Sequence, residues 1–141
     1  MSRQHRARAF TLIELLLVMV ILAVLAAVVI PNIAGYGDKA KRNGTIADIA
    51  SIKSALRAFE VDNSRFPTTE EGLNALVTCP PDLTSSWKAG GYLDKVPNDK
   101  YGHPYIYRFP GTINPNGYDI LSTGKDGNEG TEDDITQDTE K

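Results

Sequence analysis

Apolar residues dominate the chain from Phe10 to Pro31, a stretch that reads FTLIELLLVMVILAVLAAVVIP and contains one charged residue, Glu14. A helix over residues 10–30 would be roughly 31 Å long at the rise of an α-helix, enough to cross the hydrocarbon core of a bilayer. No later segment is as apolar over such a length. The pattern therefore predicts a transmembrane stem helix over residues 10–31, followed by a water-soluble domain.

After the stem, apolar residues recur at spacings of three and four. One stripe is formed by Ile46, Ile49, Ile52, Leu56 and Phe59. This spacing predicts an amphipathic continuation of the helix over residues 32–62, with the stripe packed against a small sheet. Cations that fall mostly on the other side are Lys39, Lys41, Arg42, Lys53 and Arg57. They form either a solvated face or a surface that meets acidic groups on neighbouring subunits.

The junction between the two helical stretches carries residues that weaken helices. Pro31 removes one backbone donor and crowds the preceding turn, and Gly35 and Gly37 follow it. These residues predict a kink or a local unwinding of the helix, with Asn43 or Thr45 as the cap of a restart.

Residues 63–141 show shorter elements. Thr68 with Glu71 three positions later has the spacing of a capping box, which predicts a short helix through Leu76. Residues 77–104 are rich in Pro, Gly, Asp and Ser and predict a loop region.

Alternating residues then mark strands. Residues 105–109 read YIYRF, and residues 118–123 follow the turn signal Asn116-Gly117 as a returning strand. Two or three short strands beside one long helix predict an α+β head over residues 63–141.

The nine residues before the apolar stretch, MSRQHRARA, carry three arginines. Cationic flanks stay in the cytoplasm, so the C-terminal domain is expected on the outer side. An ordinary secretory signal would have a shorter apolar core and a small-x-small site after it. An uncleaved anchor does not account for Glu14, because a carboxylate within a membrane costs on the order of 3 kcal/mol.

This leader, followed by Phe10-Thr11-Leu12-Ile13-Glu14, resembles the N-terminal signal of type IV pilins and pseudopilins. The resemblance implies that a prepilin peptidase removes residues 1–9 by cutting between Ala9 and Phe10, and then methylates the new amine of Phe10. The family usually has glycine at the position of Ala9, so processing is expected to be slower.

Cleavage gives Glu14 a physical role. The new α-amine of Phe10 is a cation four residues away, and a low dielectric strengthens its pairing with a carboxylate. The partner amine belongs either to the same chain or to the next subunit of a filament. The family resemblance favours the next subunit, so Glu14 is expected to direct assembly.

Three further segments, DNSRFPTTEEGL, GGYLDKVPNDKYGHPY and LSTGKDG, resemble the major pseudopilins of type II secretion systems. The resemblance implies an inner-membrane protein with a periplasmic head that polymerises into a helical filament, the pseudopilus, and drives export of folded proteins. It also implies minor pseudopilins, an inner-membrane assembly platform and a secretion ATPase as partners. The alternatives are a type IV pilin, a minor pseudopilin, or a Ca²⁺-dependent periplasmic binding module on an uncleaved anchor.

Residues 122–134 read STGKDGNEGTEDD. The spacing is not that of an EF-hand, because Gly130 stands at a ligand position and Gln137 replaces the closing glutamate. Taken alone, the segment is typical of a solvated acidic tail. The family resemblance implies a Ca²⁺ site in this loop, with side-chain ligands from Asp126, Asp133 and Asp134 and backbone oxygens near Thr123 and Thr131.

Composition narrows the function further. The net charge of −3 over 141 residues gives no support for a nucleic-acid partner. The one cysteine, Cys79, excludes an internal disulfide and is expected to be a half-buried apolar residue. The two histidines, His5 and His103, complete no recognisable catalytic set, which favours a structural protein over an enzyme.

Overall fold

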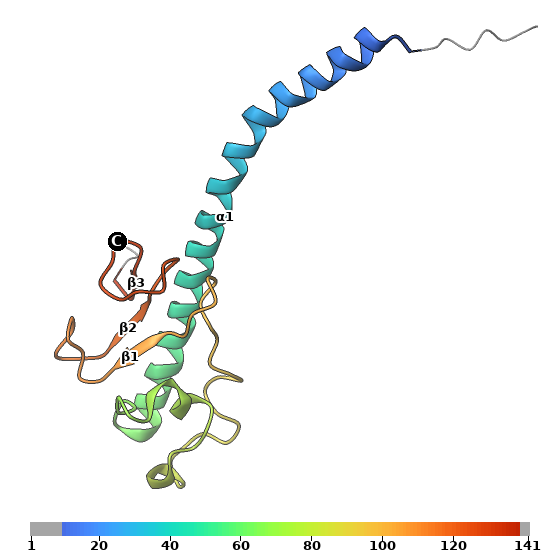
Figure 1. Ribbon diagram of the computed structural model, residues 1–141. Helices are drawn as coiled ribbons and strands as arrows, with labels where there is room; N and C mark the ends of the chain where they lie inside the picture. Colours follow the sequence, from blue (N-terminus) through green and yellow to red (C-terminus); the bar gives the residue numbers. More distant parts are fainter. Residues whose placement is uncertain (1–9, 139–141) are drawn as a thin grey trace, which may run out of the picture. The chain divides into compact units, whose positions relative to one another are not determined.

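The structure, a computed structural model, describes residues 10–138, and of residues 28–36 it describes the backbone alone. The leader with Ala9 lies outside the described residues. The chain divides into two compact units, Met1–Asp38 and Lys39–Lys141. Helix α1 (Leu12–Asn63) belongs to both (Figure 1).

In the first unit, α1 exposes its large apolar side chains. Every large hydrophobic residue from Phe10 to Leu25 has at least 48% of its surface exposed. Within the described residues, no helix combines the length and the apolar character needed to cross a membrane.

Of the two alternatives at Pro31, local unwinding is wrong for this structure, because α1 remains helical from Leu12 to Asn63. A proline deprives a helix of one backbone hydrogen bond, and the bonds on either side continue. Neither Asn43 nor Thr45 therefore caps a restart, because both lie inside α1. The Thr45 side chain has a different role. It is fully buried within α1, where its hydroxyl accepts a hydrogen bond from the backbone N–H of Lys100 at 3.2 Å.

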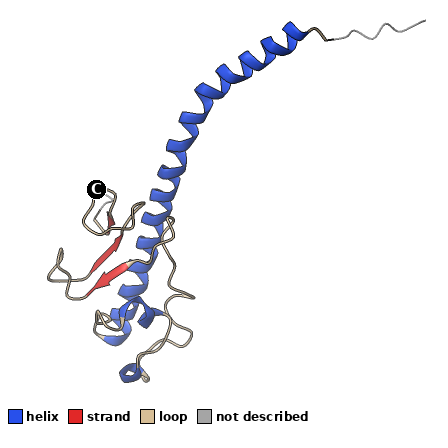
Figure 2. Cartoon of the chain, viewed as in Figure 1, coloured by secondary structure: helices blue, strands red, loops and turns tan. Residues whose placement is uncertain are grey.

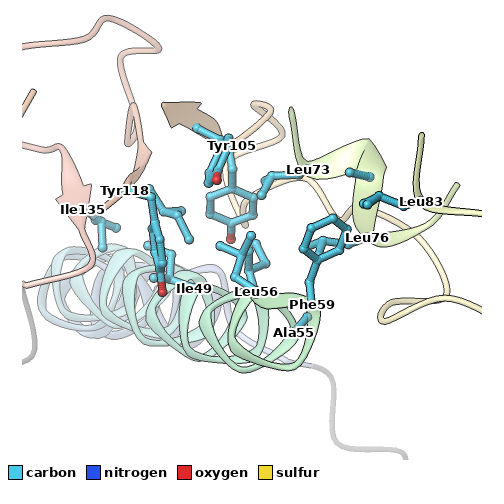
Figure 3. Packing of buried hydrophobic residues seen from close by; sticks show 14 residues of the cluster. Ile49, Ala55, Leu56, Phe59, Leu73, Leu76, Leu83, Tyr105, Tyr118 and Ile135 are labelled. Carbon is cyan, nitrogen blue, oxygen red and sulfur yellow. The ribbon is translucent and has the colours of Figure 1, made fainter. Parts of the chain in front are cut away.

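In the second unit, the predicted stripe of α1 forms one side of the core. Ile49, Ile52, Leu56 and Phe59 are at most 3% exposed, and Ile46 packs against them. Figure 3 shows Ile49, Leu56 and Phe59 pointing from α1 toward the sheet and toward the short helix η1 (Gly72–Leu76). Burial of this stripe is what holds the C-terminal part of α1 on the head.

The head contains a three-stranded antiparallel sheet with the order β1-β2-β3 (Figure 2). The strands are β1 (Ile106–Arg108), β2 (Asp119–Ser122) and β3 (Ile135–Thr136). Tyr107 pairs with Ile120, and Ser122 pairs with Ile135. The α+β head is therefore confirmed. Strand β1 was predicted from alternating residues and β2 from the turn signal before it, whereas the two residues of β3 are too few for a pattern.

The capping box at Thr68 is confirmed. The backbone N–H of Thr68 donates to Glu71 Oε2 at 2.7 Å, and the N–H of Glu71 donates to Thr68 Oγ1 at 3.2 Å. The predicted short helix follows as the 3-10 helix η1, and a second 3-10 helix, η2 (Pro81–Leu83), interrupts the predicted loop region. Cys79 is half-buried, as expected.

Two of the cations on α1 contact the head of their own chain. The ammonium group of Lys41 lies 5.5 Å from the centre of the Tyr101 ring, and Lys53 Nζ donates to the backbone oxygen of Gln137 at 3.3 Å. Lys41 is nevertheless exposed, as a solvated face predicts, whereas Lys53 is half-buried.

Candidate functional site

The first residues of the stem form a second capping box. The backbone N–H and the hydroxyl of Thr11 both donate to Glu14 Oε2 at 3.0 Å, and the N–H of Glu14 donates to Thr11 Oγ1 at 3.3 Å. Thr11 therefore caps the N-terminus of α1 and orients Glu14, the only carboxylate of the apolar stretch. The sequence analysis missed this role of Thr11, although the spacing T-x-x-E signals it as it did at Thr68.

The acidic loop between β2 and β3 is organised around Asp133. Its Oδ2 accepts hydrogen bonds from the backbone N–H groups of Lys125 at 2.6 Å and Asp126 at 3.0 Å, and its Oδ1 accepts from the hydroxyl of Thr131 at 2.6 Å. These hydrogen bonds lower the pKa of Asp133 to about 2. The Thr131 hydroxyl contributes most to the shift, and the N–H of Asp126 contributes next. Asp133 is therefore ionised at neutral pH and joins the two ends of the loop.

The other two predicted acidic ligands lie in the same loop. Asp126 Oδ1 accepts from the N–H of Asn128 at 2.9 Å and stands 3.4 Å from the Thr131 hydroxyl, so one hydroxyl lies close to both Asp126 and Asp133. Asp134 Oδ2 accepts from the N–H of Gly130 at 2.7 Å. Asp134 Oδ1 is buried and has no hydrogen-bond partner, which is costly for a charged oxygen.

Of the residues that carry the predicted ligands, Thr123 is buried directly after β2, and Thr131 is exposed within the loop. Among the described residues, no three acidic, histidine or cysteine side chains are arranged as a metal cluster. The carboxylates share one loop, and hydrogen-bond donors of that loop occupy most of their oxygens.

A buried aspartate that the sequence analysis missed supports the start of this loop. Asp99 is 5% exposed, and its Oδ2 accepts a hydrogen bond from the hydroxyl of Ser122 at 2.5 Å. Ser122 Oγ accepts in turn from the N–H of Gly124 at 3.1 Å, and His103 Nδ1 lies 2.9 Å from the oxygen of Gly124. Asp99 precedes Ser122 by 23 positions, so no local spacing in the sequence indicates this contact.

Comparisons with known proteins agree at both ends of the chain. A family profile described as "Type II secretion system (T2SS), protein G" matches residues 32–138. A profile described as "Prokaryotic N-terminal methylation motif" matches residues 4–30.

Individual relatives agree with these profiles. The chain is 41% identical over 138 residues to the type II secretion system core protein G of Escherichia coli (strain K12), which covers 96% of this chain and 94% of the relative. It is 46% identical over 133 residues to the protein of that name from Pectobacterium carotovorum subsp. carotovorum, with 93% and 84% covered. A crystal structure of the major pseudopilin from the type 2 secretion system of enterohaemorrhagic Escherichia coli matches with a TM-score of 0.64 and 39% identity, covering 75% of this chain and 93% of that chain.

A long N-terminal helix that carries a methylation motif and packs on a small antiparallel sheet defines the class of pilin-like proteins. Within that class, the chain belongs to the family of type II secretion system protein G. The function predicted from the sequence, a major subunit of the secretion pseudopilus, is confirmed, and the pilin, minor-pseudopilin and binding-module alternatives are set aside. The family is one of structural subunits.

Proposed function

We propose that the chain is made as a precursor, cleaved between Ala9 and Phe10 by a prepilin peptidase, methylated on the amine of Phe10, and then polymerised from the inner membrane into a periplasmic filament. The observation that carries this proposal is the exposed apolar surface from Phe10 to Leu25, which lies within residues 4–30, the segment that matches the methylation motif. An apolar surface of this extent requires a partner other than water, and a lipid bilayer or the stems of neighbouring subunits provide one. The stem over residues 10–31 therefore holds the subunit in the membrane before assembly, with the head in the periplasm.

Glu14 supplies the polar contact within this apolar surface. After cleavage, the methylated amine of Phe10 carries a positive charge, and a neighbouring subunit presents the same amine. The contacts to Thr11 keep the carboxylate of Glu14 in one orientation at the first turn of α1. Pairing between Glu14 of one subunit and the amine of the next then sets their axial position in the filament.

Assembly of such a filament requires further proteins. Minor pseudopilins begin the filament, an inner-membrane assembly platform feeds subunits into it, and a cytoplasmic secretion ATPase supplies the energy. The growing pseudopilus pushes folded proteins through the outer membrane. The membership of the family in the type II secretion system supports these partners.

The acidic loop is proposed to hold one Ca²⁺ ion. Ca²⁺ prefers 6–8 oxygen ligands from carboxylates and carbonyls in a flexible arrangement, and the loop provides oxygens only. Asp126, Asp133 and Asp134 would supply carboxylates, and the backbone near Thr123 and Thr131 would supply carbonyl oxygens. The buried Asp134 Oδ1, which has no hydrogen-bond partner, fits such a role.

The ion would contribute positive charge that offsets the repulsion among these carboxylates. Because the described loop forms no ready metal cluster, an oxygen such as Asp133 Oδ2 would exchange its backbone donors for the ion. The alternative is a solvated acidic loop that binds no metal, and calcium removal distinguishes the two.

Mass measurement and N-terminal sequencing of the mature protein test the processing proposal. In cells with an active prepilin peptidase, the chain is expected to begin at methylated Phe10. A chain that begins at Met1, or one cut after Ile30, would contradict the proposal. Ala9→Gly is expected to be processed at least as fast as the wild type, and a block would mean that the cleavage site lies elsewhere.

A further inference from the structure

One ion pair joins the middle of the acidic loop to the neighbouring strand. Arg108, the last residue of β1, donates from Nη1 to Glu129 Oε1 at 2.6 Å and from Nη2 to Glu129 Oε2 at 2.7 Å. Both side chains are about one-third exposed, at 33% and 40%. A two-pronged pair of this kind fixes direction as well as distance, which a single charge contact does not.

The position of Glu129 gives this pair its significance. Glu129 lies between Asp126 and Thr131, and thus between the two parts of the proposed ligand set. The loop leaves β2 and enters β3, whereas Arg108 belongs to β1 on the other side of β2. The pair therefore connects the middle of the loop to β1, on the side of β2 that is opposite β3.

A second contact acts in the same direction. His103 lies 2.9 Å from the backbone oxygen of Gly124, and its ring lies against Gly127, where an added Cβ would be 3.1 Å from the ring atoms. Gly127 has a φ of +72°, so a side chain there would be strained as well as crowded. His103 and Arg108 thus contact the loop at Gly124, Gly127 and Glu129 through the protein's own groups.

We propose that Arg108 is a positioning residue for the calcium ion, and that its pair with Glu129 holds the loop close to the arrangement that binds the ion. This inference rests on the proposed calcium site. A loop that is already ordered loses less conformational entropy on binding, and its apparent affinity rises with the fraction of molecules in the competent arrangement.

Simple electrostatics makes the opposite prediction. The loop from Lys125 to Asp134 has five carboxylates and one lysine, and Arg108 is a further cation beside it. Removing a cation from the neighbourhood of a calcium site should tighten binding if charge alone matters. The sign of the change on removing Arg108 therefore separates positioning from charge.

The test is calorimetric titration of the full-length protein in detergent with CaCl₂ at pH 7. Arg108→Gln is expected to weaken binding about threefold, because the competent fraction of the loop falls. Arg108→Lys keeps the charge but not the two-pronged geometry. Its calcium affinity is expected to lie between those of the wild type and Arg108→Gln. Exchange of the pair, Arg108→Glu with Glu129→Arg, keeps the net charge and is expected to restore most of the affinity.

A second readout follows the loop without the ion. In chelator, trypsin is expected to cut Arg108→Gln after Lys125 faster than it cuts the wild type, while the fluorescence of Trp87 confirms that the head is folded. Equal or tighter calcium binding by Arg108→Gln would overturn the positioning role and leave the calcium site intact. No binding by the wild type would remove the calcium site itself, and the inference with it. If Arg108→Gln fails to fold, the lysine variant and the exchanged pair decide the question.

Discussion

The two parts of α1 differ in the exposure of their apolar side chains. From Phe10 to Leu25 the large apolar residues are all exposed, and Leu12 reaches 81%. From Ile49 to Phe59 the apolar stripe is almost completely buried against the sheet and η1. The difference follows from sequence, because the first part is apolar on every side of the helix and the second is apolar on one side only.

This contrast separates stability from assembly. A residue in the buried stripe contributes to folding of the head within a single chain. A large apolar side chain in the exposed stem is not buried by the described residues of that chain, so its contribution is expected to appear only in a membrane or in a filament. Substitutions in the buried stripe are therefore expected to reduce the stability of the head, and substitutions in the stem to reduce membrane insertion or filament yield.

The largest effect is expected from Glu14→Ala. The variant removes the only carboxylate of the apolar stretch, so neighbouring subunits lose the partner of the Phe10 amine, and filament yield is expected to fall by at least tenfold, which is the effect of about 1.4 kcal/mol in each contact. Electron microscopy and sedimentation of sheared filaments measure the yield. Membrane insertion is expected to remain normal, and Glu14→Asp to be intermediate. Normal filaments from Glu14→Ala would remove the residue from assembly.

A matched pair of truncations in α1 tests the contrast directly. Phe59 is fully buried, and its ring centre lies 5.3 Å from that of Tyr92, so Phe59→Ala is expected to reduce the unfolding free energy of the head by about 3–5 kcal/mol. Leu22 is 59% exposed, and Leu22→Ala is expected to leave that free energy unchanged. Denaturant unfolding in detergent, followed by the fluorescence of Trp87, measures both. Comparable losses for the two variants would contradict the division of α1.

The sequence predicted the fold where a repeated spacing carries the signal. The stripe of α1, the capping box at Thr68 and the strand around Tyr107 all depend on residues within a few positions of one another. The unwinding predicted as one alternative at Pro31 was wrong, because the local cost of a proline does not by itself end a long helix. The position of strand β3 was not predicted, because two residues are too few to show a periodic pattern.

For the candidate site, too, the sequence predicted the residues with a local signal and missed the contacts between distant residues. Glu14 stands out as a lone charge, and the aspartates of the acidic loop stand out by composition. The contacts that hold the loop join residues far apart in the chain, such as Asp99 with Ser122 and Arg108 with Glu129, which are 23 and 21 positions apart. Only the folded chain brings these pairs together.

Calcium removal is expected to affect the head and not the stem. An ion that binds only the folded head stabilises it by about 2.7 kcal/mol at a hundredfold excess over Kd. The melting temperature of the full-length protein is expected to be higher in Ca²⁺ than in chelator, with Mg²⁺ substituting poorly because it requires a tighter octahedron. Asp126→Ala is expected to behave in Ca²⁺ as the wild type does in chelator. Coincident melting curves in all three buffers would identify the segment as a solvated acidic loop.

The smallest effect is expected from the capping box at Thr68, which shares the spacing T-x-x-E with the box at Thr11 in the stem. Glu71 accepts two hydrogen bonds from Arg65, at 2.7 and 2.8 Å, and this pairing lowers the pKa of Glu71 from 4.5 to about 2. Its contribution to stability is therefore fully present above about pH 4.5 and is lost as the pH falls toward 2.

Glu71→Gln keeps a side-chain oxygen for the N–H of Thr68 but loses the charge that pairs with Arg65. It is expected to reduce the unfolding free energy by about 1 kcal/mol at pH 7, since the pair is partly exposed. The difference from the wild type should shrink between pH 4.5 and pH 2, because the wild-type carboxylate becomes protonated over that range. Glu14→Gln, the matched change in the stem, is expected to leave the stability of the head unchanged at every pH while reducing filament yield. A loss of head stability from Glu14→Gln, or a difference for Glu71→Gln that persists unchanged to pH 2, would show that the two boxes do not divide stability and assembly between them.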